Sequence, residues 1–451
     1  MARARFVFAL SALAAAATAL SACSSSVSSS APQDPFAAPV VPGQGAQGLP
    51  GDLHGTINAP TPRSGSGVVT VALVGGAQLP TETAEAFTKA TGFSVAVVPV
   101  DGVAMVPKAD ADVVLGLDGA DALQAARAGM IAGAPPQDTM TLAGTAVDGA
   151  PAAVAYGRDD VCVIADKSWM SANNRPLPTS FHDLSDPRVR ALLTVPDPAS
   201  SSVGRAFVQE AASQTGEGLG PFVQSLNPRV DASLGATIGA WTAGAYVSDS
   251  YLSEVVGSES GKSGSYPLVV APRSLAAAAA TNTGADSYGT AVTSTCIARI
   301  MYVAATQAPA SDGAESLIAW LQGEIAQRSL ATTGAAYPID GVLAADTKAE
   351  WLMGISGNAV VTDETIGSLD AMNAWLSTWS SAIEAPAPAS TPEPTTEPTT
   401  EPQTSSAADP VQDEAGAEDD GPAAVPRPRS SCRTIRSRAR MGPSSRAASR
   451  G

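Results

Sequence analysis

Few residues of this sequence have side chains that could do covalent chemistry, and they stand apart from one another. The two histidines are His54, in a stretch rich in Pro and Gly, and His182, in Phe181-His182-Asp183-Leu184. We interpret His182 as a surface or capping residue, which leaves a Ser-His-Asp hydrolase little to be built from. No group of Cys and His has the spacing of a metal site. The sequence therefore predicts no catalytic residues, no metal and no cofactor.

Cys23 is the exception, because its position indicates a covalent modification. Two arginines, Arg3 and Arg5, precede an apolar stretch from Phe6 to Leu20, which runs into Leu20-Ser21-Ala22-Cys23. This order is typical of a secretory signal, and the stretch is short for a membrane span. It resembles the lipobox of bacterial lipoproteins, whose cysteine receives a diacylglycerol. The resemblance implies a signal peptide over residues 1–22 and an extracytoplasmic protein held at the cell membrane by a lipid on Cys23. A chance cysteine after an ordinary cleaved signal is the alternative.

Composition sets both ends of the chain apart from its middle. Residues 23–67 are rich in Ser, Ala, Pro and Gly and read as a flexible tether. Residues 385–451 form a tail of Pro, Thr and Glu, then acidic residues, then Arg and Ser, which cannot bury a core. The Arg-rich end is either a polybasic arm or the product of a shifted reading frame. The net charge of −17 argues against a nucleic-acid partner.

Two cysteines lie inside apolar, strand-like runs of the middle part. They are Cys162, in Val161–Ile164, and Cys296, in Cys296–Ile300. Because an exported protein meets an oxidising compartment, we expect a disulfide between them. Two unpaired buried cysteines are the alternative.

Strands alternate with helices in this middle part, which predicts an α/β fold with mostly parallel sheets. The expected strands are residues 68–74, 94–100, 112–117, 192–195 and 268–270, with extended runs over 154–166 and 295–304. Helices are expected after each of the first strands, over 315–330 as a single helix, and over about 365–383. Ligands of such folds sit beyond the carboxyl ends of the strands. Those ends are Gly75-Gly76-Ala77-Gln78 and Gly116-Leu117-Asp118.

Polar residues gather at one expected helix start as well. Asp197, Ser200, Ser201 and Ser202 follow the strand at 192–195 and could form a small polar cradle. An ordinary helix cap explains them equally well. Asp118 has the same two interpretations, as a contact for a cationic ligand or as a helix cap.

The middle part resembles the type 2 solute-binding proteins of ABC importers, and within them the thiamine-binding branch. Ala111–Asp118 carries the strongest likeness, to that branch's third strand and the loop after it. Weaker matches follow in the family's order: Phe87, Thr91-Gly92, Asp101-Gly102-Val103, Asp166-Lys167, Asp197-Pro198, Trp241, Thr333-Gly334 and Tyr337-Pro338.

The resemblance implies a fold of two α/β lobes joined by two crossover strands, with a ligand held between the lobes. Lobe 1 would comprise residues 68–160 and 297–384, and lobe 2 residues 161–296, with crossovers near Val161–Ile164 and Cys296–Ile300. The protein would act as a monomer that delivers a small polar ligand, thiamine or a related cationic heterocycle, to an ABC permease. The residues expected to bind that ligand are Gly75, Gly76, Gln78, Gly116, Asp118, Asp197, Ser200, Ser201, Ser202, Trp241, Tyr246 and Tyr337.

An aromatic sandwich would hold such a ring by stacking and cation–π attraction. Trp241 is expected to supply one face and Tyr246 or Tyr337 the other. The sequence departs from the thiamine branch where that branch has aromatic and acidic residues, here Gly75–Gln78, and where it has a Trp, here Ala335-Ala336. A surface enzyme acting on carbohydrate or cell wall, and a sensing or adhesion module, remain as alternative functions.

Overall fold

The computed structural model describes seven segments of the chain. Residues 1–60 and 386–451 lie outside them, and with them Cys23, His54, and nearly all of the predicted tether and tail. Among the helices of the described part, none is long and apolar enough to cross a bilayer. The described segments are residues 61–137, 139–142, 145–255, 263–281, 286–309, 311–354 and 369–385.

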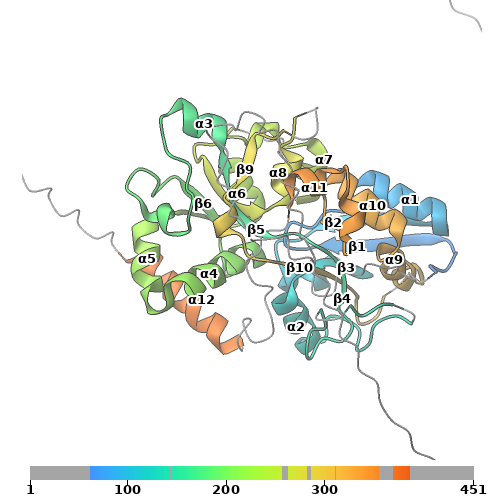
Figure 1. The fold of residues 1–451 in the computed structure, drawn as a ribbon. Coiled ribbons are helices and arrows are strands. Elements are labelled where there is room, and N and C mark those ends of the chain that lie inside the picture. Colours follow the sequence, from blue (N-terminus) through green and yellow to red (C-terminus); the bar gives the residue numbers. More distant parts are fainter. Residues whose placement is uncertain are drawn as a thin grey trace, which may run out of the picture. The chain divides into compact units, whose positions relative to one another are not determined.

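The first of two sheets combines strands from both halves of the chain (Figure 1). Its order is β2-β1-β3-β10-β4, with β1 parallel to β2 and β3, and β10 antiparallel to β3 and β4. Every residue of β3, β4 and β10 is buried, as in strands covered on both faces. The strands are β1 (Gly67–Leu73), β2 (Phe93–Pro99), β3 (Val113–Leu117), β4 (Val154–Arg158) and β10 (Ile300–Ala305).

Helices cover both faces of this sheet. Because side chains alternate along a strand, Val69 and Val71 of β1 pack with α1, α9 and α10, while Ala72 packs on the other side with α2. Phe87 of α1 meets Trp320 of α9 edge-on, with ring centroids 5.5 Å apart. These helices are α1 (Thr81–Thr91), α2 (Gly119–Arg127), α9 (Gly313–Leu321) and α10 (Glu324–Thr333), and α11 (Lys348–Leu352) packs on α10.

The single helix predicted over residues 315–330 is two helices in the structure. Gly323 separates α9 from α10 with an extended backbone, at φ −80° and ψ 154°. Glycine is a poor helix former, so a break there is inexpensive. As a result Ile325, which the helical period placed on the buried face, is 65% exposed.

The second sheet has the order β7-β6-β8-β5-β9. β6 runs parallel to β7 and β8, whereas β5 runs antiparallel to β8 and β9. Its strands are β5 (Val161–Asp166), β6 (Leu193–Pro196), β7 (Arg229–Asp231), β8 (Leu268–Pro272) and β9 (Gly289–Ala291). Its helices are α3 (Lys167–Ala172), α4 (Ser202–Thr215), α5 (Leu219–Leu226), α6 (Leu234–Ala240), α7 (Asp249–Val255) and α8 (Ser274–Ala278). Two mixed sheets flanked by helices confirm the predicted fold class.

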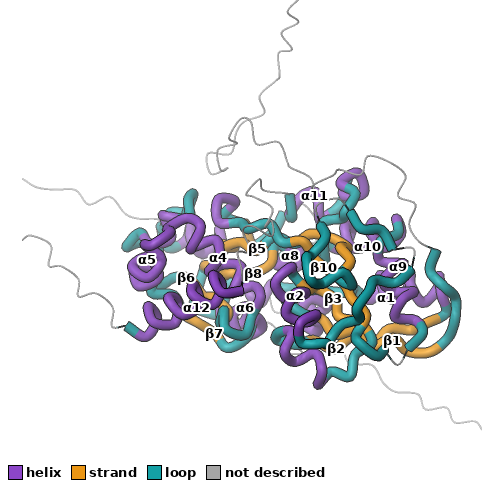
Figure 2. The backbone as a smooth tube through the Cα atoms, turned by 90° about the horizontal axis from the view of Figure 1, so that it is seen from below, coloured by secondary structure: helices purple, strands orange, loops and turns teal. Residues whose placement is uncertain are grey.

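The last helix, α12 (Leu369–Glu384), packs with the second sheet and not with the first. It lies along α4 and α5 in both views of the backbone (Figures 1 and 2). Trp379 and Ala382 belong to the core of the second sheet, where the Trp379 ring meets Phe207 edge-on at 6.0 Å. This corrects the expectation that lobe 1 extends to residue 384. The apolar face of the helix was predicted, but periodicity does not say which sheet it covers.

The chain passes between the sheets along two adjacent segments. The first passage is Asp159-Asp160, between β4 and β5, and the second is Ile297–Arg299, which leads into β10. They pair as antiparallel backbone, because the N–H of Asp159 donates to the carbonyl of Arg299 at 3.0 Å and that of Ile297 to Val161 at 2.9 Å. Next to this pairing a disulfide joins Cys162 to Cys296, whose Cα atoms are 4.1 Å apart. The predicted bridge is therefore present and ties the two passages together.

Candidate functional site

The loop after β1 brings the first sheet into contact with residues of the second. Gly75 and Gly76 have left-handed backbones, with φ of +63° and +80°. A Cβ atom at Gly75 would lie 2.6 Å from the Ser202 hydroxyl, and one at Gly76 would lie 2.8 Å from a Leu234 methyl. Only glycine combines this conformation with so close an approach. The two glycines therefore allow the part of the protein built on the first sheet to contact the part built on the second. We call these parts the two halves, and the boundary between them the seam.

The other predicted strand end has a structural explanation. Gly116 has φ +97°, and a Cβ atom there would lie 2.3 Å from both the Ala77 Cβ and the Val74 carbonyl oxygen. Asp118 caps α2, because its Oδ1 accepts from the N–H of Asp121 at 2.7 Å. Gly116 thus allows the loop after β1 to pack closely on β3. The Asp118 side chain acts as a helix cap, which was the second of its two interpretations.

A buried ion pair crosses the seam close to Asp118. The carboxylate of Asp121, fully buried in α2, pairs with the guanidinium of Arg205 in α4. Burial raises the pKa of Asp121 to about 7, and the nearby charge of Asp118 raises it further, although Arg205 opposes both. The pair is separated by 84 residues of sequence, which hid it from sequence reasoning.

The polar residues before α4 divide between capping and the seam. Asp197 holds the turn by accepting from the N–H of Ala199 at 3.0 Å, and Ser200 is exposed. Ser201 caps α4 by accepting from the N–H of Gly204 at 3.4 Å. Ser202 is buried against Gly75, and its Oγ has no hydrogen-bond partner within the described structure. Of these four predicted residues, Ser201 also lines the seam cavity, and Ser202 lies against Gly75 and beside Asp121.

Arg299, in the second passage, links the passages to the seam. Its Nη1 donates to the carbonyl of Gly75 at 2.8 Å and its Nε to that of Asp159 at 3.0 Å. Its Nη2 lies 3.8 Å from Asp159 Oδ2, within ion-pair range but too far for a hydrogen bond. Burial raises the pKa of Asp159 to about 6, against the lowering effect of Arg299 and of Ser274, whose N–H donates to Asp159 Oδ1 at 3.0 Å.

A second buried pair fixes the passage itself. Arg158 donates to Asp160 through Nε at 2.6 Å and Nη2 at 2.9 Å, which is a two-pronged contact. Asp160 Oδ1 also accepts from the N–H of Arg299 at 3.2 Å. The carboxylate is thereby fully engaged, and we assign this pair to holding the passages in place.

Helix α7, from the second half, contacts the segment that precedes α1 in the first half. Glu254 Oε2 accepts from the N–H of Leu79, ahead of α1, at 2.7 Å. Burial raises the pKa of Glu254 to about 7, with the Leu79 N–H opposing and Glu82 adding to the rise. One turn earlier Tyr251 is fully buried, near Ser274 and Asp159.

Buried polar atoms without a partner concentrate at this boundary. Six residues that contact one another in sequence-distant pairs each carry such an atom: Asp121 Oδ2, Asp159 Oδ2, Ser202 Oγ, Tyr251 OH, Ser274 Oγ and Arg299 Nη2. We call these six residues the seam cluster. Gln78 Nε2, next to Leu79, is a further one, whereas Ser316 Oγ in α9 lies elsewhere. Leaving a buried polar group unpaired costs about 1–3 kcal/mol, so a group of such atoms at one place calls for an explanation.

A small cavity lies at the seam among the described residues. Its volume is about 20 Å³, room for about one water molecule. A more open groove of about 370 Å³ is lined by Val98, Pro99, Val100, Asp101, Met105, Lys108, Ala109 and Val255. The cavity is lined by Leu73, Gly75, Gly76, Ala77, Pro99, Val100, Asp101, Ser201, Leu234, Glu254 and Val255, none of which is aromatic.

The three aromatic residues predicted to contact a ligand have different surroundings. Trp241 is fully buried in the core of the second sheet, and its Nε1 donates to the carbonyl of Pro267 at 3.2 Å. Tyr246 is exposed and stacks on Tyr288, with centroids 3.8 Å apart. Tyr337 pairs through its backbone with Arg158 and packs near α11. In this structure the faces of the Trp241 ring are covered by core residues.

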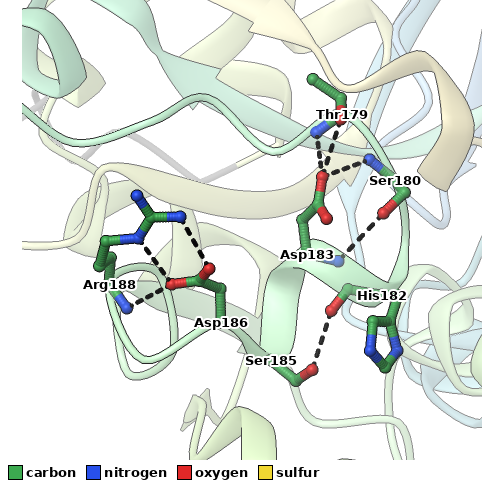
Figure 3. A network of polar contacts seen from close by, with 7 residues as sticks. All are labelled: Thr179, Ser180, His182, Asp183, Ser185, Asp186 and Arg188. Carbon is green, nitrogen blue, oxygen red and sulfur yellow. Dashed lines mark hydrogen bonds and ion pairs between the residues drawn. The ribbon is translucent and has the colours of Figure 1, made fainter.

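The surroundings of His182 agree with its interpretation as a surface residue. Figure 3 shows the hydrogen bond from Ser185 Oγ reaching the backbone carbonyl of His182, at 2.8 Å, rather than its ring. Asp183 accepts from the Thr179 N–H and hydroxyl, both at 2.8 Å, and this lowers its pKa. These contacts shape an exposed turn and form no catalytic set.

The same network contains a local ion pair. Asp186 accepts from Arg188 through Nε at 3.0 Å and Nη2 at 2.9 Å (Figure 3), and these bonds lower the pKa of Asp186 to about 2. Across the described residues no group of three His, Cys, Asp or Glu side chains is placed to hold a metal ion.

Comparison with known proteins finds likeness in structure and none in sequence. No protein-family profile matches the chain. No curated protein sequence matches it either.

Several solved structures share its fold over nearly their whole length. A periplasmic thiamin binding protein superposes with a TM-score of 0.53 at 17% identity, covering 72% of this chain and 100% of the other. AfuA, a periplasmic binding protein from Actinobacillus pleuropneumoniae with fructose-6-phosphate bound, gives 0.50 at 14% identity, covering 70% and 98%. Iron-bound HitA from Pseudomonas aeruginosa gives 0.50 at 14%, covering 70% and 99%. At these identities the likeness establishes the fold alone: the chain has the two-lobed fold of the periplasmic binding proteins.

Proposed function

We propose that this protein is an extracytoplasmic solute-binding protein, which encloses a small polar ligand at the seam and delivers it to an ABC permease. The observation that carries the proposal is the seam cluster, whose unpaired polar atoms come from both sheets and from both passages. A ligand that supplied their missing hydrogen bonds would hold the two halves together. No bond-making step is needed, so the protein is not an enzyme in this proposal.

Two adjacent passages suit the motion that such a protein requires. Short paired segments can act as a hinge, while each sheet keeps its own core. Two polar contacts join the halves across the seam, Asp121 with Arg205 and the Leu79 N–H with Glu254, beside the close approach of Gly75 and Gly76 to Ser202 and Leu234. We propose that they yield when the halves separate and admit the ligand to the seam cluster.

Thiamine stays a prediction with partial support. Asp121 and Asp159 are the acidic side chains that the seam cluster offers to a cationic ring, in place of the predicted Asp118, which caps α2. Of the predicted aromatic faces, Trp241 is buried in the core of the second sheet and Tyr246 stacks on Tyr288. Isothermal titration of the exported protein with thiamine and its phosphates decides this specificity, and an absence of heat would remove it while leaving the receptor class in place.

The experiment for the function itself measures closure together with binding. Dyes on exposed positions of each half, for example Glu85 and Arg190 changed to cysteine, would report the distance between the halves by energy transfer. We expect a metabolite pool that contains the ligand to change this distance and raise the melting temperature, since a ligand at 100 times its Kd adds about 2.7 kcal/mol. A broad pool that changes neither would contradict the proposal.

The lipid anchor is proposed from the sequence alone. A Cys23→Ala variant is expected to lose incorporation of a labelled fatty acid and to leave the membrane fraction. Unlabelled wild-type protein would show that Cys23 follows an ordinary cleavage site instead.

A further inference from the structure

The seam cluster presents free atoms of both charge signs at one place. Arg299 Nη2 and Asp159 Oδ2 each lack a hydrogen-bond partner, and they lie 3.8 Å apart. Hydroxyl groups flank both atoms. The Ser202 hydroxyl and the Arg299 guanidinium both lie close to Gly75, and Ser274 and Tyr251 lie beside Asp159.

Charged groups of both signs surround these atoms. Asp118, Asp121, Asp159 and Asp160 interact with one another and with Arg158, Arg205, Arg273 and Arg299. Two further acids stand at the seam: Glu254, which accepts from the Leu79 N–H, and Asp101, which lines the cavity. A buried charge is costly unless it is paired. A ligand that carries both signs offers a partner to the cation and to the anion at this place and adds no net charge.

Building on the proposed function, we propose that the seam binds a compact zwitterion of the α-amino acid class. Its carboxylate accepts from Arg299 Nη2 and the Ser202 hydroxyl, and its ammonium donates to Asp159 Oδ2 beside the hydroxyls of Ser274 and Tyr251. The 3.8 Å between the two free charged atoms suits a ligand whose charges sit on neighbouring carbons. A purely cationic ligand would leave Arg299 Nη2 unpaired, and a purely anionic one would meet Asp159.

The test compares amino acids with derivatives that lack one charge. Calorimetry on the exported protein uses free L-amino acids, then the amide of any that binds, which lacks the carboxylate charge, and its N-acetyl derivative, which lacks the ammonium. We expect at least one free amino acid to bind and both derivatives to bind at least about tenfold more weakly, as befits the loss of a hydrogen bond to a charged group. Thiamine and fructose 6-phosphate serve as the cationic and anionic comparisons.

Two serine variants separate the site from the fold. Ser202→Ala is expected to weaken amino-acid binding about tenfold, while Ser316→Ala is expected to leave it unchanged. Both serines are buried with an unpaired hydroxyl, but Ser316 lies in α9, away from the seam. Equal effects of the two variants would overturn the proposal. An Asp159→Asn variant that still folds should bind the N-acetyl derivative and the parent amino acid about equally.

Failure of this inference differs from failure of the proposed function. If no free amino acid binds at millimolar concentration but thiamine or fructose 6-phosphate does, the zwitterion is wrong and the receptor stands. If a derivative that lacks one of the two charges binds as well as its parent, the charge argument is wrong. If nothing in the broad metabolite pool binds or moves the halves, both proposals fall.

Discussion

Three buried carboxyl groups at the seam keep their protons to unusually high pH. Burial is the main cause for each: it raises the pKa of Asp121 to about 7, of Asp159 to about 6 and of Glu254 to about 7. Since these values exceed those of the unfolded chain, the folded state binds protons more tightly. Stability is therefore greatest below the unfolded pKa values and falls as pH rises towards 7.

Glu254→Gln tests this linkage without breaking the contact, because a glutamine oxygen can still accept from the Leu79 N–H. We expect the variant to match the wild type near pH 4 and to be more stable than it at pH 8, where Glu254 must carry a buried charge. Chemical denaturation at several pH values measures the difference. Glu85→Gln, on the exposed side of α1, is the control. A pH-independent difference for Glu254→Gln would contradict the assignment.

The glycines allow a test of close packing separately from backbone strain. Gly116→Ala and Gly129→Ala both place a side chain on a left-handed backbone, at φ +97° and +64°, but only Gly116 has backbone atoms in the way. Left-handed strain costs about 1–2 kcal/mol for either substitution. We expect Gly116→Ala to lose clearly more free energy of unfolding than Gly129→Ala. Similar losses of unfolding free energy in the two variants would show that the loop after β1 adjusts to the added Cβ atom without a further free-energy cost.

At the scale of elements, α12 ties a distant part of the chain into the second sheet's core. Trp379 packs edge-on against Phe207 of α4 and is 3% exposed. Truncating a buried aromatic side chain removes this contact and leaves a cavity. We expect Trp379→Ala to lower the free energy of unfolding by about 3–5 kcal/mol.

Trp351→Ala is the matched control, because that side chain on α11 is 46% exposed. Its loss should change the free energy of unfolding by less than about 1 kcal/mol. Equal effects in urea denaturation would mean that α12 does not belong to the cooperative core.

For the whole molecule, the disulfide between the passages closes a loop with a sequence separation of 134 residues. In the chain-entropy account a loop of this length stabilises by about 4–5 kcal/mol. Reduction is expected to lower the free energy of unfolding by about that amount. Thiol counting on the unfolded, unreduced protein should find neither Cys162 nor Cys296 reactive. Mass mapping that labels either one would contradict the bridge.

Features that depend on residues near one another in the sequence, such as strands, could be predicted. Contacts between residues far apart in the sequence could not. Residues 268–270 are an apolar run with two valines, which predicts a strand. The disulfide was predicted from the expected oxidising compartment and from the strand-like runs around both cysteines. Asp121 with Arg205, and Asp159 with Arg299, meet only after folding, and nothing near them in sequence announces the contact. Trp241 illustrates a different limit. A tryptophan in a sequence can belong to a core or to a binding site, and here it is buried in the core.

The placement of α12 also bears on the order in which the protein can be completed during synthesis. The first sheet needs β10, whose last residue is Ala305, and the second needs Trp379 to cover Phe207. Neither half is therefore a continuous stretch of chain, and a ribosome must pass residue 379 before the second core is closed. Until then the side of α4 that carries Phe207 lacks the cover that Trp379 gives it in the finished protein.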